Sequence, residues 1–216
     1  TGLPVISRTP SDVFHDGRAG AVTFTGNDRL ALDGQRLVEC YSDGYSLRTE
    51  VNTFARITFT GTLSSPKTFT VKTKSGLTYE YLPLSEALGK GESANTIFWL
   101  VTKVTDTAGN YYTVTYDGNA AENDFRVSRI DYTGNDKAGL SPYASLRFTY
   151  ADNEYSPTTY ICGVPVRKSK VIASISLYNE ERKVRAFDFE YKTLNRKHLL
   201  ASVTERVADG THKNPT

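Results

Sequence analysis

Residues that could support nucleophilic or metal chemistry are few in this chain, and they are scattered. The chain contains two cysteines and three histidines. The cysteines are Cys40 and Cys162, and the histidines are His15, His198 and His212. Neither cysteine belongs to a Cys-x-x-Cys pair and no histidine lies near another, so the spacing does not match a zinc site.

A nucleophilic site needs a serine or cysteine beside a base, most often histidine. The only local pieces that approach this pattern are Cys162-Gly163 and His15-Asp16, and nothing in their positions links them. We therefore expect a packed thiol and a loop histidine. Two states stay open for the cysteines. One is a Cys40–Cys162 disulfide, as found in exported proteins. The other is two buried thiols, which pack as small apolar side chains.

Carboxylates are plentiful, but most lie in predicted turns, where they cap and solubilise the chain. A glycosidase needs two of them facing one sugar across a cleft, and no such pair stands out. Two loops are rich in oxygen ligands, and neither follows the spacing of a calcium loop such as the EF-hand. Their residues are Asp117, Asn119, Asn123 and Asp124 in one loop, and Asp152, Asn153 and Glu154 in the other. We predict no catalytic, cofactor-binding or metal-binding residues.

The stretch from Trp99 to Asp117 reads as two strands joined by a turn. Residues 99–105 and 111–116 are rich in Trp, Val, Thr and Tyr, which suit a pleated sheet. Asp106, Gly109 and Asn110 supply the turn between them, since Gly and Asn accept positive φ and Asp hydrogen-bonds turn backbone. We expect Trp99 and Tyr116 to be buried, which makes these five residues a structural motif.

Aromatic residues of this hairpin also allow a second interpretation. Tyr111 and Tyr112 together with Trp99 could form a platform for a sugar ring. Aromatic side chains on neighbouring strands are more often cross-strand packing pairs, and we favour packing here.

Strand, turn and strand then repeat along the whole chain. An all-β fold is predicted: an antiparallel meander of hairpins that forms a curved sheet or a strip of a shell, with a β-sandwich as the alternative. Residues 1–20 are predicted to be irregular except for a short strand at Val5-Ile6, and Leu84–Gly89 is the only helix candidate. The other predicted strands are 21–25, 29–32, 36–41, 54–60, 68–73, 77–82, 125–132, 143–150, 171–178, 183–191 and 199–207, and the longest irregular stretch is 151–165.

Length and charge limit the functional classes. A chain of 216 residues suits one β-rich module, 1–216. A net charge of +2 is too balanced to indicate nucleic acid or an anionic membrane as a partner. No apolar run is long enough for a transmembrane helix. The chain has no Met, and Asp209-Gly210 signals a turn after the last strand, so we expect a fragment of a longer polypeptide whose export signal lies elsewhere.

The order of several short motifs resembles the N-terminal region of the SpvB and insecticidal toxin-complex B component family. The Asp-x-x-Gly-Asn turn followed by an aromatic strand is also similar to one unit of the Rhs/YD-repeat family. The residues that carry the resemblance are Ile6-Ser7-Arg8, Asp33–Val38, Tyr45, Thr49-Glu50, Phe54–Ile57, Phe69, Val71, Lys74, Gly76, Tyr79, Tyr81, Trp99, Asp106, Gly109, Asn110, Tyr116, Ile130, Tyr132, Phe148, Tyr150, Leu199–Glu205 and Asp209-Gly210.

This resemblance implies a non-enzymatic structural scaffold without a cofactor, secreted or at the cell surface. In the family, such segments form strips of a large β-shell around a C-terminal effector region. The implied partners are neighbouring segments of the same longer polypeptide and toxin-complex-like subunits. A common ADP-ribosyltransferase motif, Glu-x-Glu, is absent, and Glu180-Glu181 lie in a predicted turn. The alternative function is a carbohydrate- or surface-binding β-module.

Overall fold

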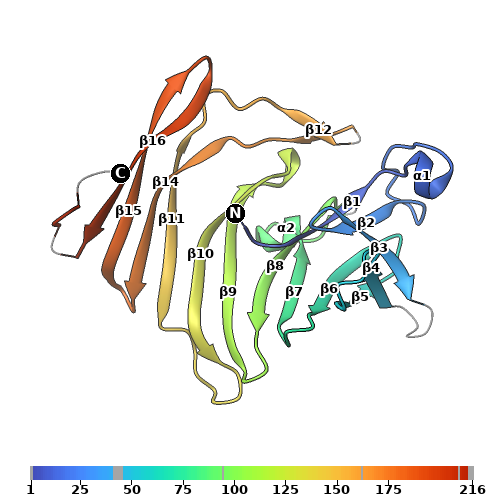
Figure 1. The fold of residues 1–216 in the computed structure, drawn as a ribbon, viewed down its shortest axis with the longest axis horizontal. Helices are drawn as coiled ribbons and strands as arrows, with labels where there is room; N and C mark the ends of the chain where they lie inside the picture. The colour runs from blue at the N-terminus through green and yellow to red at the C-terminus, as the bar shows by residue number, and fades with distance from the viewer. Residues whose placement is uncertain (1, 41–45, 94, 162, 209, 214–216) are drawn as a thin grey trace.

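The computed structural model describes residues 2–40, 46–93, 95–161, 163–208 and 210–213 (Figure 1). Fourteen of its strands form one sheet, in which neighbouring strands are antiparallel. The first eight strands are β1 (Val5–Thr9), β2 (Arg29–Leu32), β3 (Gln35–Cys40), β4 (Ser46–Thr49), β5 (Arg56–Gly61), β6 (Pro66–Lys72), β7 (Thr78–Pro83) and β8 (Phe98–Thr105). Because β1 pairs with β8 as well as with β2, these eight strands close into a barrel.

Strand β8 belongs both to the barrel and to the rest of the sheet. Its first residues pair with β1, and Ile6 lies opposite Trp99. Its last residues, 103–105, pair with β9 (Asn110–Asn119). Strand β7 pairs along the other edge of β8. The sheet therefore branches at β8, where the barrel closes and the remaining strands leave it.

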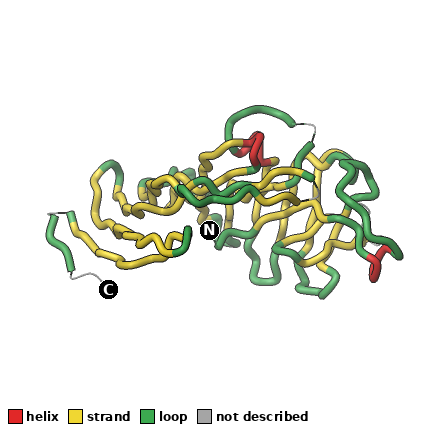
Figure 2. Tube along the Cα trace, turned by 90° about the horizontal axis from the view of Figure 1, so that it is seen from above, coloured by secondary structure: helices red, strands yellow, loops and turns green. Residues whose placement is uncertain are grey.

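The remaining strands form an open, curved part of the sheet, which we call the open sheet (Figures 1 and 2). After β9, it consists of β10 (Asp124–Asn135), β11 (Ala144–Asp152), β14 (Lys170–Asn179), β15 (Arg182–Leu194) and β16 (Lys197–Val207). Between β11 and β14 an arm, residues 153–169, carries the small hairpin β12 (Thr159–Ile161) and β13 (Val164–Val166). The helical pieces that the structure describes are short: α1 (Val13–Asp16), α2 (Leu84–Ala87) and the 3₁₀ turn η2 (Ala120–Glu122). Within the described residues, no helix is long and apolar enough to cross a membrane.

Side chains of alternating strand residues fill the barrel, as expected for a barrel of this strand number. The largest are Phe69, Tyr81 and Trp99, each at most 1% exposed. The other buried members of this core are Ile6, Leu30, Leu37, Leu47, Ile57, Val71, Val101 and Val104. The barrel is thus a packed core and not a pore.

A second apolar cluster lies between the barrel and the open sheet. It joins Leu84 of α2 and Leu100 of β8 to Val114, Tyr116 and Val127 of β9 and β10. The same face of the sheet continues outward, because directly opposed residues of antiparallel strands share a face. Its further members are Leu146, Phe148, Ile175, Leu177, Phe187, Phe189 and Val203. These side chains are only half-buried.

The structure confirms the predicted antiparallel meander with a short helix after residue 83. Two details differ. The strand expected at Val5-Ile6 extends to Thr9 and completes the barrel. Residues 21–25 form no strand, because β2 already pairs with β1 and β3 and the loop is arranged around Asp28, whose carboxylate accepts from the backbone N–H of Thr23 at 2.7 Å.

The expected irregular stretch 151–165 also differs, since it contains the small hairpin of the arm. This hairpin rests on η2 through polar contacts: Arg167 donates its backbone N–H to the carbonyl of Glu122, and the Asn123 amide donates to the carbonyl of Pro165. Such contacts with a distant segment are not visible in local alternation.

Gly134 provides a test of packing within the open sheet. It follows an irregularity between Asp131 and Gly134 in the pairing of β10 with β9, and the Tyr111 ring lies directly over it. A Cβ at position 134 would lie 2.4 Å from the ring, so Gly134→Ala should lower the free energy of unfolding by roughly 1–3 kcal/mol in urea denaturation. The matched control is Gly26→Ala, whose Cβ meets its nearest neighbour at 3.8 Å. Equal losses in both variants would contradict this packing.

Candidate functional site at the barrel mouth

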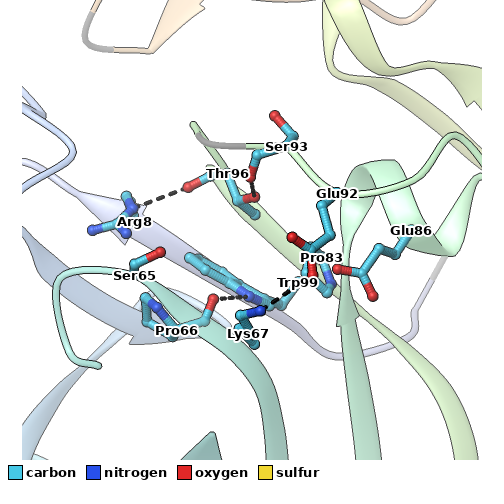
Figure 3. A pocket seen from close by; sticks show the side chains of 10 residues that line it. All are labelled: Arg8, Ser65, Pro66, Lys67, Pro83, Glu86, Glu92, Ser93, Thr96 and Trp99. Carbon is cyan, nitrogen blue, oxygen red and sulfur yellow. Dashed lines mark hydrogen bonds and ion pairs between the residues drawn. The ribbon is translucent and has the colours of Figure 1, made fainter. Parts of the chain in front are cut away.

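A cavity of about 220 Å³ opens at one end of the barrel, which we call the barrel mouth (Figure 3). Strands β1, β6, β7 and β8, the short helix α2 and the loops before β6 and β8 supply its lining residues. The lining residues are Arg8, Ser65, Pro66, Lys67, Pro83, Glu86, Glu92, Ser93, Thr96 and Trp99. At its rim, Lys67 and Glu92 pair at 3.2 Å, and both are exposed.

Arg8 lies at the inner end of this cavity and is almost fully buried. Its Nη1 lies 3.2 Å from the carboxylate of Asp28, and the two side chains are only 3% and 2% exposed. The Arg8 Nε–H donates to the carbonyl of Thr96 at 3.0 Å, and its Nη2–H donates to the carbonyl of Ser64 at 2.7 Å. Burial lowers the pKa of Arg8, while the charge of Asp28 opposes this shift. One guanidinium therefore ties β1 to three separate loops.

Aromatic rings complete the packing around the Arg8 guanidinium group. The guanidinium carbon lies 5.6 Å from the centre of the Trp99 ring and 5.8 Å from that of Phe24, within the range of cation–π attraction. The indole Nε1–H of Trp99 donates to the carbonyl of Pro66 at 3.2 Å, and Phe69 meets Trp99 edge-on at 5.2 Å. Every nitrogen of the Arg8 guanidinium group already has a partner within the protein, so Arg8 serves to close this end of the barrel core.

The structure confirms the expected burial of Trp99 and Tyr116, which are 0% and 8% exposed. The Tyr116 hydroxyl donates to the carbonyl of Val101 at 2.8 Å, and burial raises its pKa. Because Trp99 is fully buried, it cannot serve as a sugar platform. The Tyr111 ring is also in contact with other residues of the protein. The Lys103 ammonium lies 4.3 Å from its ring centre, and Gly134 lies beneath it.

The Asp-x-x-Gly-Asn turn is locked by its own side chains. The Asp106 carboxylate accepts from the backbone and side-chain N–H groups of Asn110 at 2.9 and 2.8 Å, and these bonds lower the pKa of Asp106. Gly109 has a φ of +91°, and a Cβ there would lie 2.8 Å from Lys137. The geometry accounts for all three residue types in terms of the turn.

The acidic loops weighed as calcium sites are occupied by internal contacts. Asp117 and Asp124 both pair with Arg126, and Asp124 also accepts from Ser169. Asp152 pairs with Lys170 at 2.6 Å. Among the described residues, no group of three or more His, Cys, Asp or Glu side chains is placed to hold a metal ion.

The other residues that the sequence analysis considered for catalysis do not come together in one site. Glu181 pairs with Arg147 at 2.8 Å, and His15 lies in α1. Cys162 lies outside the described residues, so its pairing with Cys40 stays a prediction. Sequence reasoning missed the Arg8–Asp28 pair as a site. The available signal was a charged residue two positions after Ile6, on the face of β1 that points into the barrel.

The chain is similar to known proteins in its fold. No protein-family model matches the chain, and no curated protein matches it in sequence. The chain superposes on the N-terminal domain of effector protein SpvB from Salmonella typhimurium strain LT2 with a TM-score of 0.69 and 14% identity, covering 95% of this chain and 87% of that one. The resemblance to the SpvB and toxin-complex family is thus confirmed at the level of fold.

Two toxin-complex structures have the same fold within much larger chains. The crystal structure of TcdB2-TccC3-Cdc42 matches with a TM-score of 0.71 and 13% identity, covering 98% of this chain and 14% of that chain. The Photorhabdus luminescens Tc holotoxin pore matches with a TM-score of 0.67 and 12% identity, covering 98% of this chain and 13% of that one. The present chain therefore spans about one seventh of the TcdB2-TccC3 chain.

Proposed function

We propose that this chain is a non-enzymatic structural scaffold module of a secreted or cell-surface, toxin-complex-like protein. It contributes β-strands to a shell around or beside a C-terminal effector region. The observation that supports this proposal is the apolar face of the open sheet. Its side chains become more exposed with increasing distance from the barrel.

The exposure of these apolar side chains increases from strand to strand. Val114 on β9 and Val127 on β10 are 5% and 2% exposed, since the barrel wall and α2 cover them. Leu177 on β14 and Phe187 on β15 are half-buried, and Leu200 on β16 is 55% exposed. Contiguous apolar surface of this kind usually marks a contact with further protein.

The opposite face of the open sheet is polar. The guanidinium carbon of Arg147 lies 4.0 Å from the centre of the Tyr178 ring, and Arg147 forms an ion pair with Glu181. Arg206 pairs with Asp188 at 2.5 Å on the same face. An antiparallel sheet with one solvated polar face and one apolar, partly covered face is suited to pack against further protein on its apolar side. The fold shared with one part of the TcdB2-TccC3 chain supports the same proposal.

The alternative, a carbohydrate- or surface-binding module, has less support. A binding site gathers apolar and aromatic walls around a few polar groups. The barrel mouth instead has a buried Trp99 and ionic groups that pair with one another. The scaffold is therefore the better-supported function.

The full-length gene product tests this proposal. A protease site placed directly after this chain allows the link to be cut, and gel filtration then shows whether the chain stays bound to the remainder. Phe187→Lys puts a charge on the apolar face and should weaken that association roughly ten- to a hundredfold, by the loss of one buried aromatic side chain. The control is Thr149→Lys, because Thr149 is exposed on the polar face.

We expect the wild-type chain to stay associated and the control to behave like it. Free separation of the wild-type chain, or a full-length product that consists of this chain alone, would overturn the scaffold proposal. So would turnover of NAD that survives repurification and is lost when one carboxylate is replaced.

A further inference from the structure

The α1 turn carries apolar side chains that the barrel does not cover. Val13 is 67% exposed and Phe14 is 90% exposed, and neither belongs to an apolar cluster of the core. Val51, which follows β4, is 73% exposed. Val51 and His15 line one hollow of about 400 Å³, and the Phe14 ring meets the His15 ring edge-on at 4.7 Å. Phe14 and Val51 therefore lie around the same hollow, with Val13 beside Phe14 on the turn.

Hydrogen bonds and ion pairs fix the α1 turn in place. The Asp12 carboxylate accepts from the backbone N–H of His15 at 2.8 Å. The Asp16 carboxylate pairs with Arg29 of β2 and with Arg36 of β3, at 2.8 Å each. Because the turn is already ordered, little conformational entropy is lost when a partner covers it.

The segment that carries Val51 is held as well. Glu50 donates its backbone N–H to β3 at 2.9 Å. The Lys74 ammonium lies 4.9 Å from the centre of the Phe54 ring, and Ala55 packs against the barrel core. Both sides of the hollow are therefore tied to the barrel.

Exposed carboxylates flank these apolar side chains. Asp12 and Glu50 line the hollow, and their side chains are 49% and 45% exposed. The Arg36 side chain also lines it, but it is only 18% exposed and already pairs with Asp16. The more exposed charges are therefore negative, which fits a partner with lysine or arginine side chains and not an anionic membrane. We call Asp12, Val13, Phe14, Glu50 and Val51 the α1 surface.

The α1 surface lies far from the outer strands of the open sheet. Helix α1 and strand β16 lie at opposite ends of the molecule (Figure 1). Protein that covers the apolar face of the open sheet near β16 therefore leaves the α1 surface free for a separate contact.

We propose that the α1 surface is a second docking site, which takes an apolar pocket bordered by lysine or arginine side chains in the remainder of the same polypeptide. Phe14 is its anchor, because buried aromatic side chains dominate many protein interfaces and a fixed turn presents this ring uncovered. Asp12 and Glu50 face the basic border and set the orientation of the contact. This inference rests on the scaffold function, which supplies the longer polypeptide.

Hydroxyl-radical footprinting of the uncut full-length gene product tests the α1 surface, because the radical modifies accessible aromatic side chains. Phe54 is the internal reference, since it is 65% exposed and lies outside the α1 surface. Without a partner, Phe14 is the more exposed of the two rings and should be modified faster. With the docked pocket, Phe14 should be modified at least about fivefold more slowly than Phe54, because an anchoring side chain is desolvated.

Variants of the product that is cut directly after this chain show whether the contact contributes to binding. Phe14→Ser should weaken the association of the chain with the remainder roughly tenfold or more, the usual effect of losing an anchoring aromatic side chain. The matched control Phe54→Ser should bind like the wild type. Glu50→Lys leaves the Asp12 cap intact and should weaken the association more at low salt than at high salt.

Modification of Phe14 as fast as that of Phe54, or a Phe14→Ser chain that binds as tightly as the wild type, would overturn the α1 surface. Either result leaves the scaffold function standing as long as the wild-type chain stays associated, whereas free separation of that chain overturns the scaffold function. Binding of the product to vesicles of phosphatidylcholine and phosphatidylglycerol that Phe14→Ser abolishes would assign the surface to a membrane and overturn the inference as well.

Discussion

Replacing Trp99 with alanine is expected to lower the free energy of unfolding by about 3–5 kcal/mol, the usual cost of removing a large buried aromatic side chain. Trp99 is 0% exposed and stands at the point where β1 closes the barrel against β8. Its loss leaves a cavity beside Phe69 and removes the ring that faces the Arg8 guanidinium. The measurement is urea unfolding followed by circular dichroism, since Trp99 is the only tryptophan and its fluorescence is lost with it.

A matched variant separates the volume of Trp99 from its hydrogen bond. Trp99→Phe keeps most of the ring but removes the donor to the carbonyl of Pro66. It should cost roughly 1–2 kcal/mol, the range for one buried unsatisfied polar group. Hydrogen exchange in β1 should rise more in Trp99→Ala than in Trp99→Phe, because β1 loses its packing partner. A loss below about 1 kcal/mol in Trp99→Ala would show that Trp99 does not hold the barrel closed.

Arg8→Met is expected to cost about 3–5 kcal/mol, because it leaves the buried carboxylate of Asp28 without its charge partner. Methionine fills much of the space of the arginine stem, so the loss reports on charge and hydrogen bonds more than on volume. The carbonyls of Ser64 and Thr96 also lose their donors. Urea unfolding at pH 7 measures the change.

A double-mutant cycle identifies the ion pair as the cause. Asp28→Asn keeps an oxygen that can accept from the backbone N–H of Thr23 while removing the charge. In Arg8→Met/Asp28→Asn no unpaired charge stays buried, so the combined loss should fall short of the sum of the single losses by roughly 0.5–3 kcal/mol. Strict additivity would show that Arg8 and Asp28 act independently. Surface pairs such as Lys67–Glu92 serve as the control, since exposed pairs contribute little.

The sequence by itself determined the local elements of this protein. Alternating apolar and polar residues place side chains on opposite faces of a strand, and turn residues decide where the strand ends. The β8–β9 hairpin follows from this rule, because Asp106, Gly109 and Asn110 form its turn from within a few residues. The burial of Trp99 and Tyr116 and the short helix α2 follow in the same way.

Tertiary structure alone decided how the sheet closes. Alternation says which face of β1 is buried but not which strand lies beside it, and its partner β8 is far away in the sequence. The Arg8–Asp28 pair and the contacts of the arm with η2 depend on the same kind of long-range placement. Closing a long loop lowers the conformational entropy of the chain, and only contacts that form together in the folded chain offset this loss. A local pattern of residues cannot specify such contacts, because each of them depends on where the rest of the barrel lies.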